Sequence, residues 1–485
     1  MTAAAPVRLT VKALAVAECN VNPCRVNNHP SSGEFMPLTP LIQQARRLLR
    51  DEHFGEILVG TIFSLGGKVG AVVFGLGLNF FVARVYGADS LGVLAIIISV
   101  TTIASLFSLG GTDMAIMKLV PEHFTRYSAR SAWRVFRKLL GLVLAHSAVV
   151  VGVLWFAAGP LAERVFDKPY LADLLRLCAV FVAFYAVERI CIEALRPLKA
   201  IRLYSVAQFL HLAVNLGLLA AITTWGDDPY NPVYAYFATS GLLALVMLGV
   251  VATLFMGRVE PGQQNGPAPY RGIYDLSLPM LMTTSMAVVI ANTDVVMLGA
   301  MRTETEVGIY QIAVKVGMLA SFVLQAINAM AAPKFSELYH SGKHDELIVV
   351  TQQSTKLIFW ATTPIILGIV LTGPWLLGIF GEEYVAGYGA LVFLAMGQFI
   401  NAISGSVGYY LSMTGAHKAF RNIITLGAVI NIVLNWLLIP RWGLEGAAFA
   451  SMIGLGFWNL ASVVYIRMKY GFLILYLPGL RRVLG

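Results

Sequence analysis

The stretch SLPMLMTTSMAVVIANTDVVMLGAM, residues 277–301, is long and apolar enough to cross a lipid bilayer as a helix, yet it contains the carboxylate of Asp294. An ionised carboxylate at the centre of a membrane costs at least about 2.5 kcal/mol, so it normally faces a protein interior or a water-filled cavity. A second long apolar stretch, residues 307–339, follows directly and contains Lys315. Two charged membrane helices in succession indicate a protein that carries a polar solute through a membrane.

The composition predicts an all-α integral membrane protein. Hydrophobic residues make up 58% of the 485 residues and charged residues 13%, with a mean hydropathy of +0.73, whereas soluble domains have about 25% charged residues. At about 20 residues per spanning helix, we expect about 12 transmembrane helices, at residues 57–83, 91–112, 139–159, 172–194, 205–225, 232–256, 276–301, 307–332, 357–380, 386–413, 420–440 and 444–467.

The net charge of +9 has two explanations, nucleic-acid binding or basic cytoplasmic loops, and the positions of the charges decide between them. If the N-terminus lies in the cytoplasm, the cytoplasmic segments hold 26 Lys and Arg residues and the outer loops hold 5. This asymmetry is the positive-inside pattern of membrane proteins. We therefore expect both termini in the cytoplasm and no nucleic-acid partner.

The two halves of the chain resemble each other at a constant spacing of 216 residues. This spacing places Leu91-Gly92-Val93 on Val307-Gly308-Ile309 and Asn215 on Asn431. Since each half holds six spans, both enter the membrane in the same orientation, which predicts a parallel repeat of two six-helix lobes around a central cavity. Asp294 falls on Leu78, so its carboxylate belongs to one lobe only.

We expect five segments along the chain: a disordered cytoplasmic extension, an interfacial amphipathic helix, an N-lobe, a cytoplasmic linker, and a C-lobe with a basic tail, at residues 1–35, 36–55, 56–256, 257–274 and 275–485. For the extension, the alternative is that Met36 is the true initiator. The basic side of the amphipathic helix suits an anionic membrane surface, and an ordinary solvated helix is its alternative. We expect Cys178 and Cys191 to be small buried residues, and we expect no metal site.

Resemblance to a known family rests on four blocks of sequence, YGADSLGVLAIIISV, VGIYQIAVKVGMLASFVLQAINAMAAPKFSELY, YYLSMTGAHKAF and NIVLNWLLIPRWGLEGAAFASMIG. They resemble the Wzx-type polysaccharide flippases, the polysaccharide-transporter branch of the multidrug/oligosaccharidyl-lipid/polysaccharide exporter superfamily. The resemblance covers about residues 56–468 and implies twelve spans in two lobes. An aspartate after a small polar stretch, here Asn292-Thr293-Asp294, is common in such proteins.

The same resemblance implies a function and partners. It implies export of a polyprenyl-diphosphate-linked oligosaccharide across the bacterial inner (cytoplasmic) membrane, for lipopolysaccharide or exopolysaccharide biosynthesis. The implied partners are this lipid-linked oligosaccharide, membrane lipids, and a polysaccharide polymerase or export machinery. A flippase makes no covalent bond, so we expect no enzymatic activity, no catalytic residue and no cofactor.

A flippase needs a hydrated cavity with cations for phosphate groups and polar side chains for the sugar. Our substrate-binding candidates are Lys68, Lys315, Arg189, Asn292 and Gln311. Structural alternatives stay open for four of them. Lys68 could pair with Asp294 or Glu188, and Lys315 could reach toward the membrane surface. Arg189 could pair locally, and Gln311 could hydrogen bond between helices.

Three roles stay open for Asp294. It could pair with a lysine and lock the lobes together, bind an H⁺ or Na⁺ ion that couples transport to a gradient, or contact the sugar. We rank ion coupling or lobe locking above sugar contact.

Two other functions stay open for the whole chain. A cation-coupled drug or metabolite antiporter of the same superfamily would have an acidic, aromatic cavity, whereas Lys68, Lys315 and Arg189 favour an anionic substrate. A membrane polysaccharide polymerase or glycosyltransferase would need acid or base residues in a large loop outside the hydrocarbon region. The predicted outer loops are too short for that, so this function is the less favoured one.

Overall fold

The computed structural model describes residues 52–260 and 266–478, which contain helices and turns and no β-strand. The chain divides into the units Met1–Ile57 and Leu58–Gly485. The predicted extension at 1–35 and nearly all of the predicted amphipathic helix at 36–55 lie outside the described residues. The described helices of both lobes, apart from the first residues of the first helix, lie within the second unit, to which the contacts below belong.

The N-lobe follows the predicted spans closely. Its elements are α2 (Glu52–Val85), α3 (Gly87–Leu109), α4 (Thr112–Arg126), α5 (Ala129–Pro160) with the π-helical turn η1 (Leu161–Val165), α6 (Leu171–Ala194), α7 (Ile201–Thr223) and α8 (Asn231–Met256). The short helix α4 occupies a segment that the sequence analysis assigned to a cytoplasmic loop. The helix α5 begins ten residues before the predicted span, because Ser128 caps it by accepting a hydrogen bond from the Ser131 backbone N–H.

More helices are interrupted in the C-lobe than in the N-lobe. Its elements are α9 (Tyr270–Met301), α10 (Glu304–Met318), α11 (Ser321–His340), α12 (His344–Gly378), the 3₁₀ turn η2 (Glu382–Gly387), α13 (Tyr388–Ser404), α14 (Val407–Met413) and α15 (His417–Tyr470). The predicted span at 307–332 corresponds to α10 and α11, which meet at a bend of 46°. The α15 segment is two helices joined at Gly443, whose backbone is not helical, as the separate predicted spans at 420–440 and 444–467 required.

Among the described residues, eight helices are long and apolar enough to cross a membrane, and nine if the bent pair α10–α11 counts as one span. One of the eight is α15, with its break at Gly443. The helices α6 and α9 are not among them, although both coincide with predicted spans and α9 contains the shorter apolar segment Val288–Met301. The all-helical membrane fold is confirmed, while the count of twelve stays a prediction.

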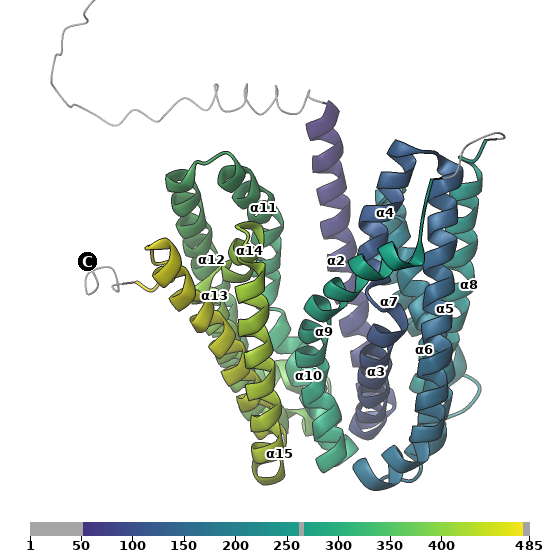
Figure 1. Cartoon of the computed structure of the whole chain (residues 1–485). Coiled ribbons are helices and arrows are strands. Elements are labelled where there is room, and N and C mark those ends of the chain that lie inside the picture. Colours follow the sequence, from purple (N-terminus) through teal and green to yellow (C-terminus); the bar gives the residue numbers. More distant parts are fainter. Residues whose placement is uncertain (1–51, 261–265, 479–485) are drawn as a thin grey trace, which may run out of the picture. The chain divides into compact units, whose positions relative to one another are not determined.

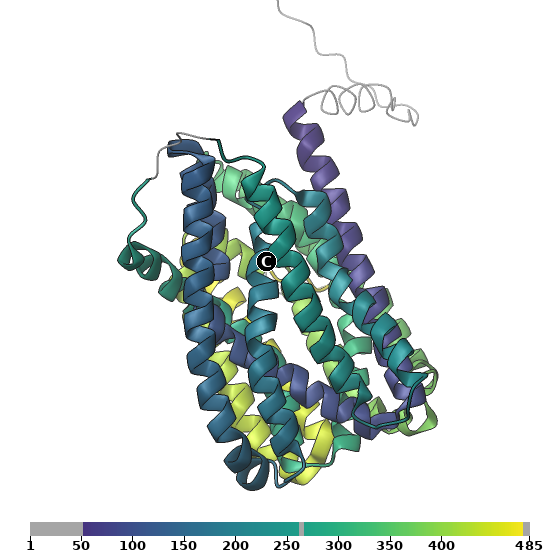
Figure 2. The same cartoon turned by 90° about the vertical axis from the view of Figure 1, so that its right-hand side faces the viewer.

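Helices of the same half pack mainly on one another. In the N-lobe α6 contacts α3, α5 and α8, and in the C-lobe α13 contacts α12 and α15. Figure 1 shows α4–α8 in one group and α11–α15 in another, with α9 and α10 between them. Figure 2 shows the blue-to-teal N-lobe helices in front of the yellow-green helices of the C-lobe. The two lobes meet chiefly where α3 contacts α9 and α10.

The contact between α3 and α10 is formed by residues that are partners in the 216-residue repeat. A Cβ atom on Gly92 would overlap the Glu304 carbonyl oxygen, and one on Gly308 would overlap the Ala88 carbonyl oxygen. Gly92 and Gly308 are repeat partners, and so are Ala88 and Glu304. Each helix therefore uses the same glycine to approach the other, which gives the close crossing that only small residues permit.

Polar contacts between the lobes gather at the end of the bundle where α3 and α10 begin, here called the α3–α10 end. Lys168 lies 3.1 Å from the Glu304 carboxylate and donates to the carbonyl oxygens of Gly299 and Arg302 at the end of α9. Thr305 donates to Asp89, its own repeat partner. The Arg84 side chain donates to the carbonyl oxygen of Ile379 at 2.9 Å. These contacts hold the two lobes together at that end.

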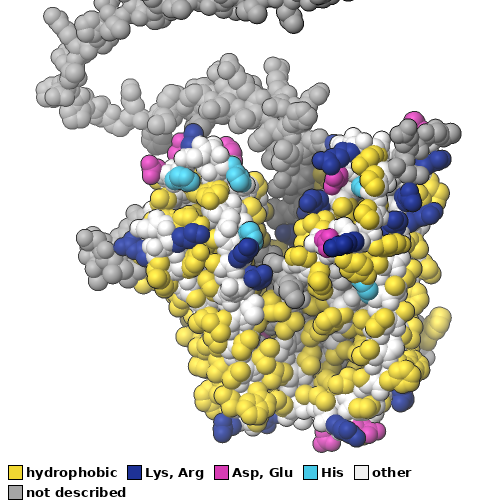
Figure 3. Space-filling model, in the orientation of Figure 1, with side chains coloured by type: hydrophobic (Ala, Val, Ile, Leu, Met, Phe, Trp, Pro, Cys, Tyr) yellow, Lys and Arg dark blue, Asp and Glu magenta, His cyan; other side chains and the backbone are white. Residues whose placement is uncertain are grey.

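The surface of the described residues is that of a multi-pass membrane protein. Figure 3 shows hydrophobic side chains covering the middle of the visible face, with Lys, Arg, Asp and Glu gathered toward its two ends. Exposed apolar side chains such as Phe156, Leu371 and Val149 are 83%, 80% and 66% accessible, values that suit contact with lipid. Cys178 and Cys191 are free and buried, as predicted.

Candidate functional site

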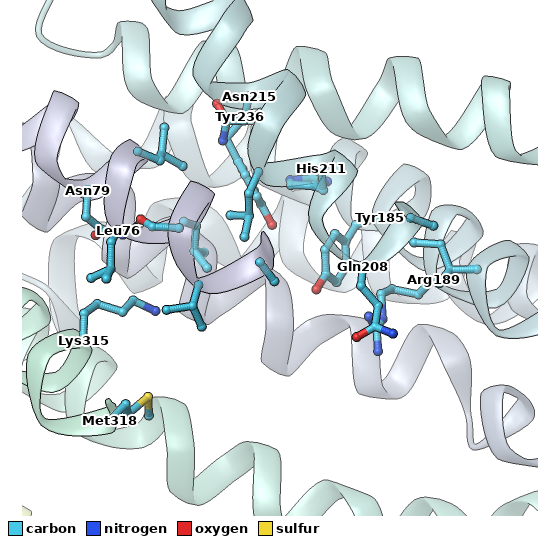
Figure 4. A pocket seen from close by; sticks show the side chains of 18 of the residues that line it. Leu76, Asn79, Tyr185, Arg189, Gln208, His211, Asn215, Tyr236, Lys315 and Met318 are labelled. Carbon is cyan, nitrogen blue, oxygen red and sulfur yellow. Dashed lines mark hydrogen bonds between the residues drawn. The ribbon is translucent and has the colours of Figure 1, made fainter. Parts of the chain in front are cut away.

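A cavity of about 620 Å³ lies between the lobes. Its walls come from α2, α3, α6, α7 and α8 of the N-lobe and from α10 and α11 of the C-lobe. The polar residues in these walls are Asn79, Tyr185, Glu188, Arg189, Glu193, Tyr204, Gln208, His211, Asn215, Tyr236, Gln311, Lys315, Ser321 and Gln325. Figure 4 shows ten of the lining side chains by label, with Lys315 and Arg189 on different walls.

Lys315 is the cation that the C-lobe contributes to the cavity. It lies on α10, and no hydrogen bond or ion pair joins its ammonium group to any residue in the described part of the chain. Figure 4 shows its side chain extending from α10 toward the N-lobe wall. Lys315 is partly buried, and an ammonium group in a protein-lined cavity with no carboxylate beside it favours an anion as its partner.

Arg189 is the cation that the N-lobe contributes to the cavity, and it is half exposed. Its guanidinium lies 3.9 Å from the Glu193 carboxylate, which also receives a contact from Arg196 at 3.3 Å. Its side chain is 45% accessible, so the loose pairing with Glu193 leaves donors free for a ligand. Of the predicted substrate-binding residues, Lys315, Arg189 and Gln311 therefore line one cavity.

Glu188, the second acidic residue in the cavity wall, is paired with a histidine. Both carboxylate oxygens of Glu188 lie 3.0 Å from Nδ1 of His211, and the Glu188 side chain is 2% accessible. Glu188 was a possible partner for Lys68 from the sequence, and in the structure it pairs with His211 instead. Since both cavity carboxylates have cationic or imidazole partners, Lys315 is left as the unbalanced charge.

Lys68 and Asn292 lie outside the cavity walls. Lys68 is exposed on α2, on the same helical stripe as the lining residues Val72, Gly75 and Asn79 but one turn beyond them. Asn292 donates to the carbonyl oxygen of Val288 in its own helix at 2.8 Å. Lys68 therefore continues the cavity-facing stripe of α2, while the Asn292 side chain hydrogen bonds within α9.

Asp294 lies apart from the cavity, inside the C-lobe, and its side chain is 5% exposed. Its carboxylate accepts hydrogen bonds from Tyr310 at 3.0 Å, Asn431 at 3.0 Å, Asn435 at 2.6 Å, and Ser451. These partners come from α10 and from both parts of α15, and all of them are neutral. The structure records no lysine beside Asp294 among the described residues. This cluster joins helices within one lobe and does not join one lobe to the other.

Sequence reasoning missed His211 and Gln208 as cavity residues, and noticed Asn215 only as the repeat partner of Asn431. A signal was present, since Gln208, His211 and Asn215 are polar residues spaced three and four apart in an apolar segment. That spacing shows that they share a face of α7, but nothing in the sequence shows that the face lines a cavity.

A family model described as polysaccharide biosynthesis protein matches residues 81–386, more than half of the chain. The chain belongs to this polysaccharide biosynthesis protein family. The probable low-salt glycan biosynthesis flippase Agl15 of Haloferax volcanii is 22% identical to it over 419 residues, which are 82% of this chain and 83% of that protein.

Solved structures share the fold of this family member. The lipid II flippase MurJ in an inward closed conformation has a TM-score of 0.68 at 13% identity, covering 84% of this chain and 87% of that one. An inward-facing multidrug resistance MATE family transporter of the MOP superfamily has a TM-score of 0.62 at 15% identity, covering 85% and 94%. These likenesses establish a transporter fold of two lobes, which is the predicted fold class.

Proposed function

We propose that this protein is a flippase that moves a polyprenyl-diphosphate-linked oligosaccharide across the cytoplasmic membrane. The observation that carries the proposal is the ammonium group of Lys315, which has no partner among the described residues and lines a cavity between two lobes that Arg189 also lines. Two cations in the walls of one cavity suit a substrate with a diphosphate, whose charges cannot cross hydrocarbon alone. Membership of the polysaccharide biosynthesis family supports a glycan as the rest of the head group.

Transport by this protein would follow alternating access, with the two lobes rocking about the cavity. The α3–α10 end carries Arg84, Lys168 and Arg302, which the charge count assigns to outer loops. Closure at this end supports a conformation in which the cavity receives its substrate from the cytoplasmic side. Release to the other leaflet would require the Lys168–Glu304 contact and the glycine crossing to separate.

We further propose that Asp294 binds the coupling ion, H⁺ or Na⁺. Its carboxylate is buried among neutral donors and has no cationic partner in the described residues. The neighbouring Asn435, whose Nδ2 donates to the carboxylate at 2.6 Å, has a buried Oδ1 atom with no hydrogen-bond partner among the described residues. A carboxylate and an amide oxygen are ligands that a hard cation prefers, and protonation would equally remove the cost of the buried charge.

A leaflet-resolved translocation assay tests the function. The full chain is reconstituted in liposomes with a fluorescent polyprenyl-diphosphate-linked oligosaccharide, and the fraction reaching the other leaflet is measured with and without H⁺ and Na⁺ gradients. We expect translocation above that of protein-free liposomes, and acceleration by one gradient. Translocation equal to the protein-free control would contradict the flippase function, and translocation that is indifferent to both gradients would contradict coupling through Asp294.

A further inference from the structure

One face of α7 carries a row of polar side chains into the cavity. Gln208, His211 and Asn215 follow one another at helical spacing and all three line the cavity. Figure 4 shows these three side chains together with Tyr185 and Tyr236 at the N-lobe wall. The row lies on a different wall from Lys315, which α10 contributes.

Each residue of this α7 row has one buried polar atom without a hydrogen-bond partner among the described residues. These atoms are Nε2 of Gln208, Nε2 of His211 and Oδ1 of Asn215. Leaving such an atom unpaired costs about 1–3 kcal/mol, and buried polar atoms in folded proteins are nearly always paired. Three side chains that carry such atoms lie on one face of one helix in the wall of a cavity. This arrangement indicates a surface made for a hydrogen-bonding ligand.

The repeat shows why Asn215 is unpaired. In the C-lobe the Oδ1 atom of its partner Asn431 accepts a hydrogen bond from Nδ2 of Asn435 at 3.2 Å. In the N-lobe the position of Asn435 is held by Leu219, which has no donor. Asn215 itself is only 1% exposed. The N-lobe therefore keeps the buried amide but has no amide donor for its oxygen, which leaves this acceptor unpaired among the described residues.

His211 is fixed so that only one of its nitrogens is free. Glu188 holds Nδ1 with both oxygens at 3.0 Å, and the rings of Tyr236 and Tyr185 flank the imidazole at centroid distances of 5.4 and 6.2 Å. The unpaired Nε2 then has one orientation. With two side-chain amides in the same row, the surface offers both donors and acceptors in fixed positions.

We propose that the α7 row is the subsite for the hydroxyl groups of the sugar next to the diphosphate, while Lys315 and Arg189 hold the diphosphate itself. This subsite rests on the proposed flippase function. A sugar presents donors and acceptors on every hydroxyl group, which matches amide and imidazole side chains better than it matches cations. A diphosphate has only acceptors and is served by the ammonium and guanidinium groups.

Two matched probes separate the subsites. One is farnesyl diphosphate, and the other is farnesyl diphosphate carrying a single N-acetylhexosamine; binding of each to the full chain in lipid nanodiscs is measured by calorimetry. The test variants are Asn215→Leu and Gln208→Met. The matched control is Asn459→Leu. Asn459 is likewise buried, with an Oδ1 atom unpaired within the described part of the chain, but it lies on α15 and does not line the cavity.

We expect the wild-type chain to bind the glycosylated probe more tightly than farnesyl diphosphate. Each α7 variant should weaken binding of the glycosylated probe by about threefold to tenfold, which corresponds to the loss of one hydrogen bond to a neutral group. The same variants should leave farnesyl diphosphate binding unchanged, which also shows that they fold. Asn459→Leu should change neither affinity.

Other outcomes overturn the subsite. If the wild-type chain binds both probes equally, or if the α7 variants weaken binding of both probes alike, the α7 row does not bind the sugar. If Asn459→Leu weakens the glycosylated probe as much as Asn215→Leu does, the effect is a loss of packing and the subsite is wrong. Failure of the wild-type chain to bind either probe would contradict the flippase function itself, together with the subsite that depends on it.

Discussion

At the residue scale, Asp294 and Lys315, the two charges that first indicated a transporter, lie in different parts of the structure. Tyr310 and Lys315 are five residues apart on α10, which at 3.6 residues per turn places them about 140° apart around the helix. The Tyr310 hydroxyl reaches Asp294 inside the C-lobe, while Lys315 lines the cavity. One helix therefore separates an anionic centre from a cationic one, and Asp294 does not neutralise Lys315.

Replacement of Lys315 tests the cationic centre. Lys315→Met keeps the length of the side chain and removes its charge, so we expect the affinity for farnesyl diphosphate to fall by about tenfold or more, the value of a hydrogen bond to a charged group. Lys315→Arg should retain most of the binding. Lys334→Met is the control, because Lys334 pairs with Glu337 on an exposed part of α11. Equal affinities for Lys315→Met and wild type would exclude Lys315 as the phosphate contact.

Replacement of Asp294 tests the coupling site. In Asp294→Asn the amide nitrogen replaces one carboxylate oxygen, so it must face either the hydroxyl groups of Tyr310 and Ser451 or the amide donors of Asn431 and Asn435. The negative charge that attracts a cation is also gone. We expect stimulation of translocation by an ion gradient to be lost, while diphosphate affinity stays within about twofold, since the cavity is separate. The exposed Asp345 provides the control Asp345→Asn. Full gradient stimulation in Asp294→Asn would rule out the coupling role.

At the element scale, the crossing of α3 and α10 controls how closely the lobes approach. Its two glycines are repeat partners, and each lies against the backbone of the other helix. Neither helix has space for a methyl group there. Adding one methyl group at either glycine would therefore push the two helices apart.

A single added methyl group tests this crossing. Gly308→Ala would place Cβ against the Ala88 carbonyl oxygen, and such overpacking costs about 1–3 kcal/mol. We expect the closed α3–α10 end to open, which accessibility of an Asp89→Cys reporter to a membrane-impermeant thiol reagent would measure. Gly217→Ala on α7 is the control, because its methyl group meets no atom within 4 Å. Identical labelling in Gly308→Ala and Gly217→Ala would show that the crossing tolerates the methyl group.

At the scale of the whole molecule, the lobes form one cavity and are joined at the α3–α10 end. Lys168, in the loop between η1 and α6, contacts Glu304 and the carbonyl oxygens at the end of α9. An N-lobe loop therefore anchors a C-lobe helix. Lysine beside helix-terminal carbonyl oxygens is favourable because of the helix dipole. The same contacts must break if the cavity is to open at this end.

Covalent closure of that end tests alternating access. Asp89 and Thr305 touch across the two lobes, so Asp89→Cys combined with Thr305→Cys, in a chain without its four native cysteines, allows a short thiol cross-linker to join the lobes. We expect cross-linking to abolish translocation and cleavage of the linker to restore it. Each single cysteine variant should be unaffected by the reagent. Undiminished translocation in the cross-linked protein would mean that this end does not open during transport.

Much of the fold could be predicted from the sequence because helices in lipid satisfy their own backbone hydrogen bonds, so apolar length alone defines them. The boundaries of α6 and α8 fall within a residue of the predicted spans, and the break at Gly443 was found as a gap between two spans. The helix α4 was missed because it is short and polar on one side. The repeat offset, a weak signal in the sequence, reappears as the reciprocal contact of Gly92 and Gly308.

The site could be predicted only in part. The sequence alone shows that charges at positions 189, 294 and 315 lie in apolar helices, and burial of a charge in hydrocarbon is costly enough to indicate a function. Which of these charges share a cavity follows only from the packing of the helices. That depends on how each helix is rotated about its axis, and packing against neighbouring helices, not the apolar length of a segment, sets this rotation. The same rotation brings Gln208, His211 and Asn215 to the cavity and encloses Asp294 in the C-lobe.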